Sequence, residues 1–182
     1  MGTLVCFFNL KVVFRMKKEV ESFHKICMNK AIANVMIGLA FLIWCAPCSV
    51  LGYTYLPEKF NVFFGQIVGW GPYLMSGPFT QICLAINRSM AINFPYRFNR
   101  QNNVPVTKIA LTTLWVIAVL ISLPSLKEGC GYIFFVEYVS WSAMDDPCSM
   151  HLSEYVTYLV IAMASLSFSI NLFSIVKIAH QS

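Results

Sequence analysis

Two cysteines in the segment WCAPC have the spacing that thiol–disulfide exchange uses. Cys45 and Cys48 lie three residues apart and follow Trp44. That chemistry needs water, a preceding strand and an amphipathic helix, whereas both cysteines lie deep in the charge-free run 31–57. We therefore interpret them as small packing residues beside Pro47, which kinks a helix, and not as a redox site.

Other reactive side chains do not gather into an enzymatic site. The three histidines fall in separate loops, without a cysteine or acid at metal-ligand spacing: His24, His151 and His180. The sequence contains no glycine-rich phosphate loop and no nucleophile elbow, and it places no ionisable residue at mid-depth of an apolar run, as a transporter would. We therefore expect no enzyme, no metal centre and no cofactor.

A second pair of cysteines, Cys130 and Cys148, encloses a β-prone segment. The charge pattern given below places this segment outside the cell, where disulfides persist. Compartment and spacing permit a bridge, which would restrain the unfolded chain by roughly 3 kcal/mol, and two separate thiols are the alternative. With a bridge, Tyr132, Phe134 and Trp141 would form a lid over the helices, and such lids commonly carry recognition.

One arginine stands at the end of a long charge-free run. Arg88 follows the uncharged residues 60–87, and Pro95 and Tyr96 come shortly after it. A guanidinium offers a fork of donors that can pair within a helix bundle or reach backbone groups of a partner protein. The simpler interpretation is a boundary residue that anchors a helix at the lipid headgroups.

These residues belong to a chain that is too apolar for a water-soluble globule. Hydrophobic residues make up 58% and charged residues only 12%, which leaves too little polar surface for solubility. A membrane span needs about 20 apolar residues, and without water its backbone is satisfied only in a helix. We predict an all-α integral membrane protein with a single domain over 1–182, with four full helices and the inner half of a first, near 1–14, 31–54, 62–92, 108–125 and 154–177.

Basic residues orient these helices, because cytoplasmic flanks accumulate Lys and Arg. Of the 13 Lys and Arg residues, only Lys59 and Lys127 fall on the opposite side. The loops 14–30 and 93–108 are therefore expected in the cytoplasm, and the loop 125–154 outside. The net charge of +5 is a topology signal and indicates no nucleic-acid binding.

With helices and loops placed, the arrangement resembles the rhodopsin-like class of seven-helix G-protein-coupled receptors. Arg88, with Pro95 seven residues on and Tyr96 beside it, is similar to the Asp-Arg-Tyr motif of that class and its following proline. Trp115 in the fourth helix, with Pro124 nine residues later, is similar to the tryptophan and proline found there.

Further details resemble one branch of that class, the nematode serpentine receptors of class X, a presumed chemosensory group. The segments SFHKICMNKAIAN (22–34) and INLFSIVKI (170–178) are similar to its second-helix start and its fifth helix. Asn9 is similar to the asparagine of the first helix, and Asn87 stands in the place of the acid before the arginine.

The resemblance implies a receptor at the plasma membrane that couples to a heterotrimeric G protein through the inner end of the third helix. Asn87, Arg88, Pro95 and Tyr96 would carry this coupling, and because Asn87 replaces an acid, the inactive state is expected to be less restrained.

A small molecule or peptide would bind among the outer helix halves. Trp70, Tyr73 and Trp44, with Trp141 above them, are the candidates to line its pocket, and packing aromatics near the lipid interface are the alternative.

Two departures from the class limit what it implies. The range 53–82 contains no cysteine and Cys83 lies near the inner end of the third helix, so the usual bridge to the outer loop is excluded, which leaves Cys130 and Cys148 to each other. The sixth and seventh helices and half of the first are also missing, so this chain is not expected to signal alone. A short non-signalling membrane protein that associates with other helices or with intact receptors is the alternative function.

Overall fold

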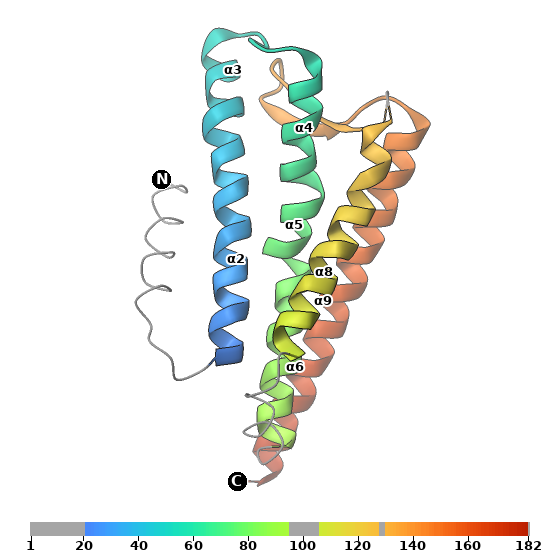
Figure 1. The fold of residues 1–182 in the computed structure, drawn as a ribbon. Helices are drawn as coiled ribbons and strands as arrows, with labels where there is room; N and C mark the ends of the chain where they lie inside the picture. Colours follow the sequence, from blue (N-terminus) through green and yellow to red (C-terminus); the bar gives the residue numbers. More distant parts are fainter. Residues whose placement is uncertain (1–20, 95–105, 128–129, 182) are drawn as a thin grey trace.

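A computed structural model describes residues 21–94, 106–127 and 130–181 (Figure 1). Asn9, Pro95 and Tyr96 lie outside the described residues, as does the predicted helix near 1–14. The described chain forms a bundle of long helices with a small β-hairpin at one end (Figure 1). Following the predicted orientation, we call the hairpin end of the bundle the outer end and the opposite end the inner end.

The first described helix is longer than predicted and changes its winding near its outer end. It comprises α2 (Glu21–Ala40), the π-helical turn η1 (Phe41–Cys45) and α3 (Ala46–Leu51). The helix begins before the predicted position 31, because basic residues have good helix propensity and let it continue beyond the apolar part. The charge-free run marks only that apolar part. The helix ends at Gly52, whose φ of 75° is the left-handed conformation of a helix C-cap.

Proline explains the wide turn within this helix. Pro47 has no N–H for the carbonyl of Ile43 and its ring would collide with that carbonyl, so a π-helical turn precedes it. The hydroxyl of Tyr55 donates a hydrogen bond to the Ile43 carbonyl. Cys45 and Cys48 are buried here as free thiols. This placement favours the interpretation of both as packing residues.

The segment predicted as one helix over 62–92 is divided, which corrects that prediction. Breaks at Trp70 and Gly77 separate three helices, which follow one another along one path (Figure 1): α4 (Glu58–Gly69), α5 (Gly71–Ser76) and α6 (Pro78–Asn93). Pro72 and Pro78 lack the N–H that would continue each preceding helix. At the second break, the Thr80 hydroxyl donates to the carbonyl of Met75.

The remaining elements are two helices and the hairpin between them. The fourth predicted span is α8 (Val106–Ser122) with the 3-10 turn η2 (Leu123–Leu126), and the last is α9 (Pro147–Gln181), which begins before the predicted position 154. Strands β1 (Tyr132–Phe135) and β2 (Ser140–Ala143) pair antiparallel, with Phe134 opposite Trp141.

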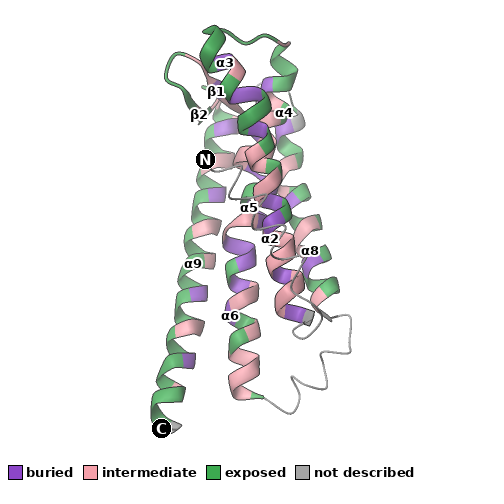
Figure 2. Ribbon diagram, turned by 90° about the vertical axis from the view of Figure 1, so that its left-hand side faces the viewer, coloured by how far each residue is buried: buried purple, intermediate pink, exposed green. Residues whose placement is uncertain are grey.

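Within the described part of the chain, three helices are long and apolar enough to cross a membrane: Ser22–Leu51, Thr107–Ser125 and Pro147–His180. The charge-free run 60–87 is not among them, because its breaks leave shorter helices. Figure 2 shows exposed residues along most of α9, and many of these are large and apolar, such as Phe168 and Ile175. An apolar surface of this kind on the exposed side of α9 suits contact with lipid or with other helices.

The core that holds the helices together lies around the two breaks. Helix α6 packs along α9, and α5 packs against both α2 and α8. The buried cluster between them joins small residues of α2 and α8 and one valine of α9 to bulky residues around the breaks: Ala33, Trp70, Leu74, Met75, Phe79, Ala118 and Val156. Small alanines facing large side chains let these helices approach closely.

Candidate ligand-binding site and inner end

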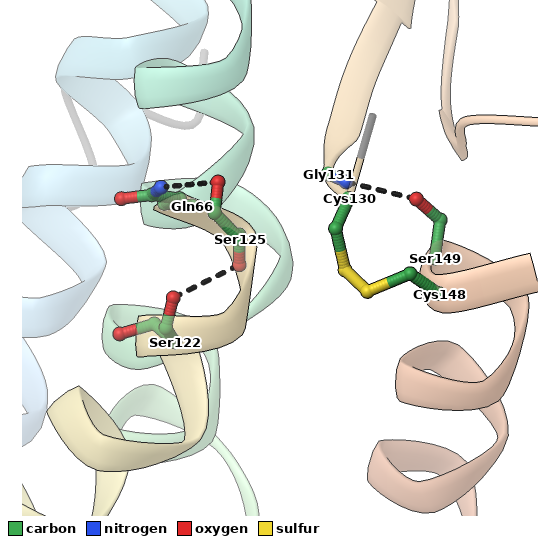
Figure 3. The surroundings of a disulfide bond; sticks show 7 residues. All are labelled: Gln66, Ser122, Ser125, Cys130, Gly131, Cys148 and Ser149. Atoms are coloured by element: carbon green, nitrogen blue, oxygen red, sulfur yellow. Dashed lines mark hydrogen bonds between the residues drawn. A yellow bond between two sulfur atoms is a disulfide. The ribbon is translucent and has the colours of Figure 1, made fainter. Parts of the chain in front are cut away.

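The outer hairpin is tied to the start of α9 by a covalent and a polar contact. Cys130 and Cys148 form a disulfide, and the Gly131 N–H donates to the Ser149 hydroxyl at 2.8 Å (Figure 3). The entry of the hairpin is thereby joined to the first turn of α9. Nearby, the Gln66 side chain donates to the carbonyl of Ser125 at 3.3 Å, which ties α4 to η2, the turn that follows α8 (Figure 3).

The hairpin also lies directly against one face of α4. A Cβ atom added at Gly65 would stand 1.5 Å from the carbonyl oxygen of Tyr132, and one added at Gly69 would stand 2.7 Å from its ring. Glycine is therefore needed at both positions for this close approach. The two residues are one helical turn apart, so they offer a single flat track to the strand.

A cavity of about 480 Å³ opens beneath the hairpin. Its walls come from α2, from the α4–α5 junction, from the hairpin and from the outer part of α9: Ile37, Phe41, Val68, Gly69, Trp70, Tyr73, Tyr132, Trp141, Ser153, Val156, Thr157, Val160 and Ile161. The structure thus brings together Trp70, Tyr73 and Trp141 in one lining. The volume falls in the range of about 300–1,000 Å³ that small-molecule sites occupy.

Aromatic rings form the upper wall of this cavity. The ring of Tyr132 lies parallel to that of Trp141, with centroids 6.3 Å apart, and edge-on to that of Trp70 at 5.6 Å. Trp70 is only 2% exposed, and its indole N–H meets no acceptor among the described residues. Burial, and to a lesser extent Tyr73, raises the pKa of the Tyr132 hydroxyl.

Trp44 does not belong to this lining, which corrects its inclusion among the pocket candidates. It is fully buried, its ring stacks on Phe64 with centroids 5.3 Å apart, and its N–H donates to Asn61. It acts instead as a packing residue between η1 and α4.

Sequence reasoning missed three residues that shape the site: Asn61, Gly65 and Gly69. Their spacing of four residues was visible as a possible helix face, but nothing local shows that a strand distant in sequence lies on it.

The inner end carries the residues predicted for G-protein coupling that the structure describes. Arg88 is exposed on α6, and Asn87 beside it is half-buried. Further along α6, the Oδ1 atom of Asn93 accepts a hydrogen bond from the ammonium of Lys177 on α9 at 2.6 Å, and its Nδ2 donates to the Ser89 carbonyl at 2.8 Å. A polar contact therefore joins the inner ends of α6 and α9.

Of the predicted packing residues, Trp115 links two helices. Its indole N–H donates to the Oδ1 atom of Asn29 on α2 at 2.7 Å, while the Nδ2 of Asn29 has no partner among the described residues. Near the inner end, the hydroxyl of Thr107 donates to that of Ser22 at 3.0 Å, again joining α8 to α2. Pro124 lies in η2, at the outer end of α8.

A family model described as the serpentine-type seven-transmembrane GPCR chemoreceptors of class Srx matches residues 1–182. The chain belongs to this family. It is also 25% identical, over 123 residues, to a D(1)-like dopamine receptor of Takifugu rubripes. That similarity covers 66% of this chain and 25% of the relative, so the match spans a quarter of the relative's length.

Membership in the Srx family identifies the class of membrane protein to which the bundle belongs. The chain is a multi-pass membrane protein whose helices form part of a seven-helix receptor bundle. Family membership points to a receptor and not to an enzyme.

Proposed function

We propose that this Srx chain contributes the ligand cavity and the G-protein-coupling end of a chemosensory receptor. The observation that carries the proposal is the meeting of Trp70, Tyr73 and Trp141 in one cavity beneath the hairpin. Trp70 sits at the break between α4 and α5, where irregular backbone turns a large side chain inward. Irregular backbone of this kind is concentrated at functional sites.

The walls indicate the chemistry of the ligand. Aliphatic and aromatic side chains dominate. The polar side-chain groups are the hydroxyls of Tyr73, Tyr132, Ser153 and Thr157 and the indole N–H groups of Trp70 and Trp141. The described lining residues include no charged side chain. A small, mostly apolar molecule with one or two hydrogen-bonding groups suits such walls, because a charged group would lose its hydration without gaining a counter-ion.

Coupling would take place at the inner end of α6, which follows α4 and α5 along one path. Arg88 is exposed there, so its guanidinium is accessible to a partner's backbone carbonyls. A ligand that favours one packing of α6 against α9 would shift the population of the coupling-competent state. The receptor would act at the plasma membrane with the Asn87–Arg88 end in the cytoplasm.

Binding is tested with 2-phenylethanol as a neutral aromatic probe, on the full chain in lipid nanodiscs, by calorimetric titration. The Trp141→Ala and Tyr73→Ala variants should each weaken binding about tenfold, because each removes part of the wall. Tyr158→Ala is the matched control, since Tyr158 is exposed on α9 and does not line the cavity. Equal weakening in all three variants, or no binding to the unmodified chain, would refute the cavity as the ligand site.

Coupling is tested by nucleotide exchange on a purified heterotrimeric G protein. Arg88→Ala should abolish any exchange that the chain promotes, whereas Lys30→Ala, which removes another basic residue from the middle of α2, should leave it unchanged. Exchange that survives Arg88→Ala would place the coupling contact elsewhere.

A further inference from the structure

Asn61 on α4 joins three separate elements at the outer end. Its side chain is 5% exposed, and its Oδ1 atom accepts hydrogen bonds from the Trp44 indole at 3.0 Å and from the Phe134 N–H at 2.8 Å. Its Nδ2 atom donates to the Phe134 carbonyl at 3.1 Å. One buried amide therefore connects η1, α4 and β1, and both lone pairs of its oxygen are used.

The two bonds to Phe134 have the form of a strand pairing. In an antiparallel ladder, alternate residues direct their N–H and C=O groups away from the neighbouring strand. Phe134 stands opposite Trp141, and both of its backbone groups bond Asn61. The side-chain amide thus completes the free edge of β1 with the donor and acceptor that a peptide group would supply.

The same face of α4 carries the glycine track. Gly65 and Gly69 follow Asn61 at intervals of four residues, so all three lie along one side of the helix. The glycines let Tyr132 approach closely, and Asn61 fixes the strand along the helix axis. Tyr132 and Trp141 reach the cavity from the strands held in this way.

We propose that Asn61 is a positioning residue that keeps the hairpin closed over the cavity and so controls ligand entry. It does at the outer end of α4 what the disulfide does at α9: each holds one side of the hairpin to the bundle. The consequence for ligand entry rests on the proposed function of the cavity, whereas the position of the hairpin is measurable without a ligand.

The experiment measures how fast a charged, membrane-impermeant thiol reagent modifies a cysteine in the cavity wall, using the full chain in membranes. Val156→Cys is the reporter, because Val156 lines the cavity on α9 and is only 6% exposed. His151→Cys is the reference reporter, because His151 is exposed on the same helix and does not line the cavity. The unsubstituted chain gives the background of the native thiols.

In the Asn61→Leu variant, the reaction at Val156→Cys should become about tenfold faster, because loss of the amide leaves three polar groups unpaired and favours the open hairpin. The reaction at His151→Cys should not change. Gln66→Leu is the matched control, since it replaces an amide on the same helix that bonds Ser125 and not the hairpin; it should leave both rates as they were.

An unchanged rate at Val156→Cys in the Asn61→Leu chain, with the reference rate preserved, would overturn the proposal. If that variant does not accumulate in membranes, Trp44→Phe is tested in its place. It retains an aromatic ring and removes one of the three hydrogen bonds to Asn61. It should give a smaller increase, of about threefold, and no increase would also overturn the proposal. Failure of 2-phenylethanol to slow the reaction would count against the ligand site and leave the role of Asn61 intact.

Discussion

At the outer end, a disulfide, a buried amide and a glycine track hold the hairpin to α9 and α4. At the inner end, α6 and α9 are joined by a partly buried hydrogen bond between Asn93 and Lys177. Buried and covalent links are costly to break, whereas a partly exposed polar bond exchanges with water at little cost. The comparison shows that covalent and buried links hold the hairpin at the outer end, whereas the polar link between the inner ends of α6 and α9 is partly exposed.

The largest effect should come from removing the covalent link. Replacing both Cys130 and Cys148 by serine opens a bridge that spans 18 residues and should lower the free energy of unfolding by about 3 kcal/mol. Chemical unfolding in detergent micelles measures this loss. Cys27→Ser, a free thiol in α2, is the control. An unchanged midpoint of unfolding for the double variant would show that the disulfide does not hold the outer end more firmly than the inner end is held.

A smaller effect is expected at the glycine track. In Gly65→Ala the new methyl group would collide with the Tyr132 carbonyl, so the hairpin must shift, at a cost of about 2 kcal/mol. Gly71→Ala is the matched control, because a Cβ added there meets nothing within 4 Å. Thermal unfolding should occur at a lower temperature in Gly65→Ala than in Gly71→Ala. Equal stability would show that the hairpin does not require a glycine at position 65.

Between the two ends, Trp115→Phe should lower the free energy of unfolding by about 1 kcal/mol, because Asn29 then loses its one described side-chain bond. Adding Asn29→Leu should restore part of the loss, since the buried polar group is removed with its partner. A double variant less stable than Trp115→Phe would argue that Asn29 has another role.

The smallest change in stability should come from the inner end. Lys177→Met should lower the free energy of unfolding by only about 0.5 kcal/mol. It should nevertheless widen the distribution of distances between spin labels placed at the exposed positions Ile86 and Ile178, on α6 and α9. A large loss of stability with an unchanged distribution would reverse the comparison between the ends.

Local pattern predicted much of the helical framework but not its breaks. Gly71 with Pro72 and Gly77 with Pro78 are visible in the sequence as helix-breaking pairs, yet the absence of charge over 60–87 masked them. The early starts of α2 and α9 were missed for a related reason, because hydrocarbon thickness limits the apolar part of a helix and not its whole length.

The candidate site was predictable only in part. Trp70 and Tyr73 lie in the outer half of the run 60–87 and Trp141 lies in the outer loop, and large aromatics at such positions are natural candidates for a pocket. Tyr132 was expected in the lid, but its place in the cavity wall depends on the glycine track. Asn61 was not predicted at all, because its bonds reach Phe134, 73 residues further along the chain.

Composition and charge spacing are enough to establish a multi-pass membrane bundle and to predict its orientation, because hydrocarbon imposes helices and Lys and Arg follow the cytoplasmic side. These constraints act on each segment separately and are therefore written in local sequence. The position of the hairpin, the shape of the cavity and the unequal fastening of the two ends depend on contacts between distant segments. Only the packed tertiary structure decides them, because it alone brings Asn61 to Phe134 and Lys177 to Asn93.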